Sequence, residues 1–193
     1  PEKPHLFLEF HGSQAGVREQ VELFESVSEE FDVGGFQWAT KAEDRNRLWT
    51  ARHNAYYAGK SLKKGCEGLI TDCCVPISTL ADCIARSKKL VAESGLIAPI
   101  VGHVGDGNFH LMILFDPNIP DELTAAKSLA AKVNHVALSY GGTVTGEHGV
   151  GTGKQSYMAK EHGAAYALMA VLKRAVDPAN IMNPGKTVEV TDA

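Results

Sequence analysis

The stretch IAPIVGHVGDGNFHLMILF, residues 97–115, decides the fold that this sequence predicts. It holds two apolar runs, 97–104 and 109–115, separated by the turn-forming residues GDGN (105–108). Turn formers between two strand-like runs are a strong signal for a β-hairpin. We therefore expect two antiparallel strands at the centre of a sheet.

Strands and helices alternate on both sides of this hairpin. Short apolar runs predict further strands at 5–10, 36–40, 69–71 and 73–75. Helical spacing of apolar residues predicts helices over 13–31, 43–57, 80–95 and 120–140, and again up to about 176. Pro76 and Gly95 bracket the third of these helices.

This alternation favours an α+β fold over a purely parallel sheet. We expect a ferredoxin-like antiparallel sheet with helices on one face and a C-terminal helical extension. The chain has 193 residues, of which 44% are hydrophobic and 22% charged, as in an ordinary globular protein. One domain, residues 1–193, is the expected organisation.

Charge and cysteine content exclude several classes of protein. The net charge of -4, without a run of five like charges, gives no signal for binding to nucleic acid or to an anionic membrane. The sequence contains no run of 18 apolar residues and no signal-peptide pattern at its start. The four cysteines form no C-x-x-C pair, and we expect buried structural thiols in a reducing compartment.

Two histidines flank the turn of the hairpin. With a two-residue loop centred on Asp106 and Gly107, His103 falls directly opposite His110. Directly opposed side chains on one sheet face have Cβ atoms about 4.5–5.5 Å apart, so both imidazoles reach one metal ion. The alternative is that the histidines merely flank a tight turn in a core hairpin. A wider bulge in the loop would displace the pairing and weaken the geometric argument.

A second polar pair lies in the glycine-rich segment GGTVTGEHGVG (141–151), where Glu147 and His148 stand among residues that leave room for a ligand. If this segment is extended, the two side chains point to opposite sides, one to a metal and one to a substrate. The segment matches neither a phosphate-binding loop nor a G-x-G-x-x-G dinucleotide turn. We therefore expect no binding of nucleoside triphosphate or NAD.

Two imidazoles and one carboxylate with open coordination positions suit a divalent transition metal. Such a centre keeps a net positive charge, attracts an α-hydroxy carboxylate and lowers the pKa of its hydroxyl group. A neighbouring histidine, His148, then takes the proton.

Three motifs together resemble the C-terminal domain of FAD-linked D-lactate and D-2-hydroxyglutarate dehydrogenases, flavoenzymes of the vanillyl-alcohol oxidase type. They are HVGDGNFH (103–110), GEHG (146–149) and NPGK (183–186). The resemblance continues upstream through LWTARH (48–53) and TDCCVPIS (71–78), so it covers most of the chain. It implies a domain that binds substrate and metal, while most FAD contacts belong to an N-terminal domain that is absent from this sequence.

The resemblance also implies the roles of the polar side chains. His103, His110 and Glu147 match the ligands of a divalent metal, Zn or Mn, and His148 matches the base beside the flavin. The implied reaction passes hydride from C2 of a 2-hydroxy acid to FAD.

Three further residues receive roles from the same resemblance. Arg52 matches the anchor of the substrate carboxylate, a role that suits the fork geometry of guanidinium, although a surface salt bridge is an alternative. Asn183 and Lys186 match positions near the flavin, although Asn-Pro-Gly is also an ordinary turn. The dicarboxylate branch of the family has a lysine in the stretch that matches 69–76, where this sequence has none, which favours a D-lactate-like monocarboxylate.

Other interpretations stay open at this point. A metal-dependent hydrolase with the same ligands would turn over without flavin, and a non-catalytic ferredoxin-like ligand-binding domain would bind no metal. The resemblance instead implies that the chain alone is inactive until it meets an FAD-binding domain and an electron acceptor of unknown identity. We expect a location in the cytoplasm or at the periphery of the inner membrane if the protein is bacterial, and in mitochondria if it is eukaryotic. An exposed face that docks the flavin domain is a hypothetical cause of homodimers.

Overall fold

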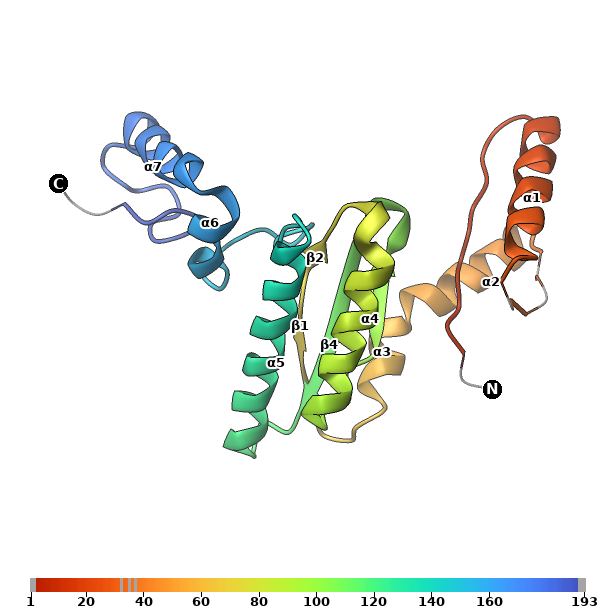
Figure 1. Cartoon of the computed structure of the whole chain (residues 1–193), viewed down its shortest axis with the longest axis horizontal. Coiled ribbons are helices and arrows are strands. Elements are labelled where there is room, and N and C mark those ends of the chain that lie inside the picture. Colours follow the sequence, from red (N-terminus) through yellow and green to blue (C-terminus); the bar gives the residue numbers. More distant parts are fainter. Residues whose placement is uncertain (1–2, 32, 35, 37, 191–193) are drawn as a thin grey trace. The chain divides into compact units, whose positions relative to one another are not determined.

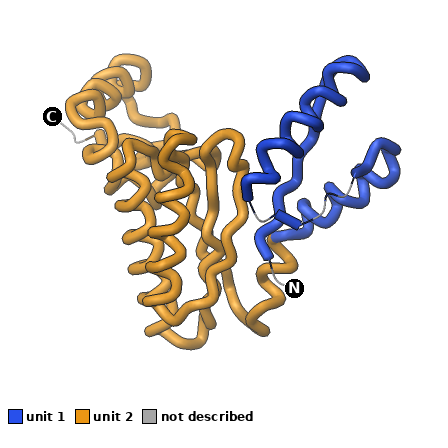
Figure 2. Tube along the Cα trace, turned by 45° about the vertical axis from the view of Figure 1, so that its right-hand side comes forward, with its two compact units in different colours: residues 1–55 blue, residues 56–193 orange. Residues whose placement is uncertain are grey.

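The computed structural model describes residues 3–31, 33–34, 36 and 38–190. The chain divides into two compact units, Pro1–Ala55 and Tyr56–Ala193 (Figure 2).

The first unit contains α1 (Gln14–Ser28) and α2 (Ala42–His53). The hydroxyl group of Ser13 accepts a hydrogen bond from Gly16 N at 3.1 Å and so caps the start of α1. In α2, two acidic residues lie in the first turn, and Arg52 and His53 lie in the last, which complements the helix dipole.

The two strands predicted in this unit are wrong where the structure describes them. Residues 5–10 form no strand, nor do residues 36 and 38–40, while Gln37 lies outside the described residues. Strands need a partner to satisfy their backbone, and here the aromatic side chains contact α1 instead. The ring of Phe24 lies 6.2 Å from Phe10 and 5.6 Å from Phe36.

The second unit is built around β4 (Asn108–Phe115), the most buried strand of the sheet. It pairs antiparallel with three strands, β1 (Glu67–Ile70), β2 (Cys73–Cys74) and β3 (Ile100–His103). β1 and β2 share one register against β4, so Asp72, which lies between them, falls opposite His110. The central hairpin predicted from the sequence is confirmed.

The loop of the hairpin differs from the predicted one. Val104–Asp106 form a short 3-10 helix, and Gly107 follows with a positive φ of 77°. The wider loop moves the register by two residues, so that His103 pairs with Asn108 and the predicted pairing with His110 is wrong. A shift of two residues keeps every side chain on its face, so the two histidines still share one face of the sheet.

Two helices cover the opposite face of the sheet, α4 (Ile77–Ser94) and α5 (Pro120–Ser139) (Figure 1). Alternate residues of β4 point into the core that they form, namely Phe109, Leu111 and Ile113. As predicted, α4 starts after Pro76 and ends at Gly95, which adopts a left-handed conformation.

The order of the elements confirms the ferredoxin-like α+β expectation. After α5 the chain returns to the sheet, where Thr143 forms an isolated antiparallel bridge with Cys74. The chain thus runs β-α-β-β-α-β, with its last strand reduced to one bridge. This return matters because it delivers the glycine-rich segment to the sheet face that carries His110.

Three further helices complete this unit, α3 (Ala55–Lys60), α6 (Gln155–His162) and α7 (Ala164–Val176). The last two form the predicted C-terminal extension.

The four cysteines are free thiols, three of them buried. Burial raises the pKa of Cys73 to about 12, in keeping with a structural role. Among the described residues, no helix has the length and apolar character that crossing a membrane requires.

Candidate metal-binding site

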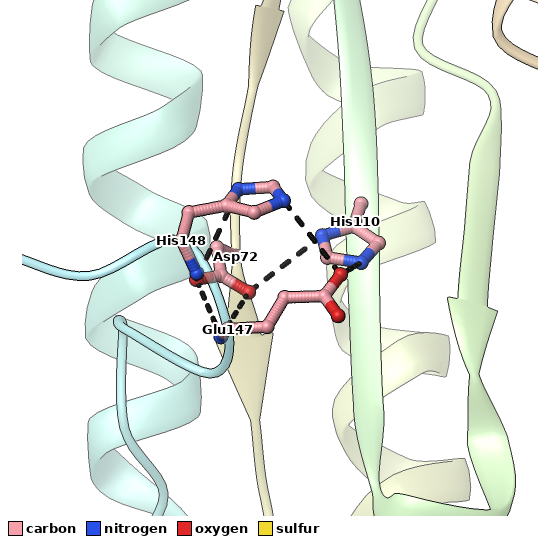
Figure 3. Close-up of side chains that lie close together, drawn as sticks. All are labelled: Asp72, His110, Glu147 and His148. Carbon is pink, nitrogen blue, oxygen red and sulfur yellow. Dashed lines mark hydrogen bonds and ion pairs between the residues drawn. The ribbon is translucent and has the colours of Figure 1, made fainter.

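Four polar side chains meet on the sheet face that the long helices leave uncovered (Figure 3). Asp72 lies between β1 and β2, and His110 lies in β4. Glu147 and His148 come from the glycine-rich loop after α5. One potential ligand atom from each residue lies within 4.8 Å of the others.

One carboxylate oxygen, Oε1 of Glu147, is the common neighbour of three imidazoles. Its distance to Nε2 is 2.9 Å for His110, 3.6 Å for His148 and 3.9 Å for His103. The structure therefore brings together His103, His110 and Glu147, the three residues predicted as ligands, with the predicted base beside them. The rings of His103 and His110 lie 6.2 Å apart, as diagonal neighbours on the face do.

The expectation that Glu147 and His148 point to opposite sides is wrong. The segment bends at these residues instead of running as a strand. The imidazole of His148 stacks on that of His110, with ring centroids 5.0 Å apart, and Glu147 reaches the same histidine. Both side chains therefore serve one site.

The hydrogen bonds of His110 show whether the site suits a metal. Its Nδ1 lies 3.0 Å from the carbonyl oxygen of Thr71, which only accepts, so Nδ1 carries the proton. In the neutral ring, Nε2 then holds a lone pair that faces Oε1 of Glu147 at 2.9 Å. Two acceptors at this distance need a proton or a metal ion between them, and the donor set of imidazoles and carboxylate fits a divalent transition metal.

Asp72 belongs to the motif TDCCVPIS (71–78), but the sequence predicted no role for this residue. The side chain is fully buried, both carboxylate oxygens accept hydrogen bonds from the loop, and Oδ1 also accepts one from Asn108. Burial by itself raises the pKa of Asp72, but the backbone N–H groups of His148 and Glu147, the amide of Asn108 and the charge of Lys154 together hold it below its usual value. An aspartate inside an apolar run was the available signal, because such a charge is rarely buried without partners.

The other predicted residues lie elsewhere in the chain. Arg52 is in α2 of the first unit, and its contact with a substrate stays a prediction. Asn183 and Lys186 are exposed in a closing turn, where Lys186 N donates to Asn183 O at 3.3 Å. The next residue ties this turn to the glycine-rich loop through a hydrogen bond from Thr187 N to Gly151 O. The flavin contacts of the turn stay predictions.

Comparison with known proteins decides the family. The model of FAD linked oxidases, C-terminal domain, matches residues 1–187. This chain belongs to that family. It is 46% identical over 189 residues to a probable mitochondrial D-lactate dehydrogenase of Danio rerio, which covers 97% of the chain and 38% of the relative. It is 33% identical to the glycolate oxidase subunit GlcD of Bacillus subtilis over 95% of the chain and 39% of that protein.

Solved structures agree on the fold. A 4-ethylphenol oxidase from Gulosibacter chungangensis superposes on 92% of the chain, and on 38% of its own, with a TM-score of 0.62 at 15% identity. For p-cresol methylhydroxylase the TM-score is 0.59 at 16% identity, over 95% of this chain and 38% of that one. This FAD-linked oxidase domain thus spans well under half the length of the relatives it matches.

Proposed function

We propose that this domain is the substrate- and metal-binding part of a flavin-dependent D-2-hydroxy-acid dehydrogenase that acts on a D-lactate-like monocarboxylate. The observation that carries the proposal is the convergence of three imidazoles on one oxygen of Glu147, on the sheet face opposite α4 and α5. The dehydrogenase and oxidase names of the relatives support the reaction class.

His103, His110 and Glu147 would hold the divalent metal, Zn or Mn, which supplies a positive centre for the carboxylate and hydroxyl oxygens of the substrate. His110 is the firmest of the three because Thr71 fixes its tautomer and the sheet buries it. The side chain of His103 is half exposed, so it is free to adjust to the ligand.

His148 accepts the hydroxyl proton at Nε2, the ring nitrogen nearest to Glu147. The FAD, held mainly by the rest of the enzyme, supplies the acceptor for the hydride that leaves C2. We assign Arg52 to the substrate carboxylate, and Asn183 and Lys186 to the flavin side of the site.

Metal titration of the purified chain tests the proposal directly. After treatment with a chelator, the chain is expected to take up about one Mn²⁺ or Zn²⁺, measured by calorimetry and elemental analysis. Glu147→Gln and His110→Ala should weaken binding at least about tenfold, and His103→Ala should weaken it less. His162→Ala is the control, since that imidazole lies beside Glu161, outside the cluster.

No metal uptake by the wild-type chain would contradict the proposed site. Equal affinity in the wild type and in Glu147→Gln would do the same. Hydrolytic turnover by the chain without flavin would instead support the hydrolase alternative.

A further inference from the structure

We propose that Asp72 is a positioning residue whose carboxylate holds Glu147 and His148 in the bend that turns both side chains toward His110. This role deepens the proposed metal and substrate site and rests on it. No such role followed from the sequence.

The directions of two consecutive N–H groups carry the proposal. In an extended segment these groups point to opposite sides, as the side chains do. Here the N–H groups of Glu147 and His148 both donate to Oδ2 of Asp72, at 2.9 and 2.8 Å. A backbone with successive N–H groups on one anion is necessarily bent, and the bend lets two adjacent side chains reach one site.

The same carboxylate already serves three N–H donors. A carboxylate offers about four lone-pair sites, and one of these donors, Glu147 N, lies against both oxygens of Asp72. Oδ1 accepts from Asn108 Nδ2 and Glu147 N, and Oδ2 accepts from Glu147 N and His148 N. Because its side chain is also fully buried, Asp72 acts on the site through the backbone that it holds.

Two neighbours support the bend from either side. The backbone oxygen of Asp72 accepts a third N–H group, that of Gly146, at 3.1 Å. A methyl group at Gly146 would lie 2.3 Å from Asn108 Nδ2 and 2.9 Å from Asp72 Oδ1. The ammonium group of Lys154 lies 3.9 Å from Oδ2 and offsets the buried negative charge. The loop therefore approaches Asp72 as closely as a glycine permits.

Asp72→Asn tests the role, because the amide replaces one of the two acceptor oxygens with a donor and removes the negative charge that the N–H groups of Asn108, Glu147 and His148 share. We expect the affinity for Mn²⁺ or Co²⁺ to fall at least about tenfold, as for other residues that orient ligands. The visible spectrum of bound Co²⁺ should change as well. Asp177→Asn is the matched control, since Asp177 also accepts two backbone N–H groups and pairs with a lysine.

A second variant keeps the test valid if Asp72→Asn does not fold. Gly146→Ala leaves the carboxylate in place but forces the loop away from it, and should lower metal affinity as Asp72→Asn does. Gly153→Ala, whose methyl group would meet no atom within 4 Å, should not. Unchanged affinity in Asp72→Asn, or equal affinity in the two glycine variants, would overturn the role.

Amide exchange separates this inference from the metal site. The amide protons of Glu147 and His148 should exchange slowly in the metal-free chain and rapidly in Asp72→Asn, as measured by NMR. If the wild type binds no metal but shows this protection, the metal site fails and the anchor stands. Rapid exchange of both amides in the wild type would overturn the anchor itself.

Discussion

At the scale of single residues, two buried aspartates bind backbone N–H groups in different parts of the second unit. Asp72 and Asp177 each accept backbone N–H groups from a following segment, and each has a lysine nearby. A carboxylate acceptor satisfies several donors at once where the chain has left regular structure. One aspartate thereby shapes the site, and the other shapes the C-terminal turn.

The pH dependence of stability tests the second aspartate. The hydrogen bond from Lys173 and those from Met182 N and Ile181 N lower the pKa of Asp177, against the opposing effect of burial. Because the pKa in the folded state lies below the unfolded value of about 3.9, the ionised group stabilises the fold above that pH and loses its effect as pH falls through the folded value.

We therefore expect Asp177→Asn to have a lower Tm than the wild type at pH 7. The difference should be constant above about pH 5 and shrink below about pH 4. Thermal unfolding followed by circular dichroism over this range measures it. A difference that does not change with pH would show that the charge of Asp177 plays no part.

At the scale of elements, the turn of the central hairpin controls where His103 and His110, the two proposed ligand histidines, lie. Gly107 has a φ of 77°, and a methyl group there would fall 2.1 Å from the carbonyl oxygen of Val75. Gly107→Ala should therefore destabilise the fold by at least about 1–2 kcal/mol, the cost of a left-handed alanine, with the clash in addition.

Gly105→Ala is the control for this prediction, since it lies in the same loop with open space around its Cα. Urea unfolding of both variants measures the change in the free energy of unfolding. A Gly107→Ala variant as stable as Gly105→Ala would mean that the turn tolerates another conformation and that the hairpin register is not set there.

Local patterns predicted the elements whose causes are local. The hairpin 97–115 and the helix between Pro76 and Gly95 followed from turn formers and periodicity. The predicted register was wrong by two residues because the sequence GDGN does not distinguish a two-residue loop from a 3-10 turn. The partner of the Glu147 and His148 backbone lies 75 residues or more away, and no periodicity reveals such a contact. Arg52, Asn183 and Lys186 depend on molecules outside this chain, so their roles stay predictions.

At the scale of the whole molecule, apolar surface remains exposed on α7. Leu168, Val171, Leu172 and Val176 are each at least half exposed and recur along one helix. Exposed patches of this kind are typical of interaction surfaces. The chain spans 38% of its Danio rerio relative. A second copy of this chain and a flavin-binding domain are the two predicted partners of this surface.

Activity is a property of the longer protein, so it is best tested with this chain in place of the matching segment of the Danio rerio relative. We expect the chimera to reduce a dye with D-lactate, to prefer it over L-lactate, and to act poorly on D-2-hydroxyglutarate. His148→Asn should lower kcat at least about 100-fold through loss of the base while the metal content stays unchanged, because we propose His148 as the base and His103, His110 and Glu147 as the ligands. Loss of metal in His148→Asn would instead make His148 a ligand, and full activity would remove it from the reaction. The parent relative with the corresponding histidine replaced controls for the junctions, since a fault in joining the segments affects the chimera but not the parent.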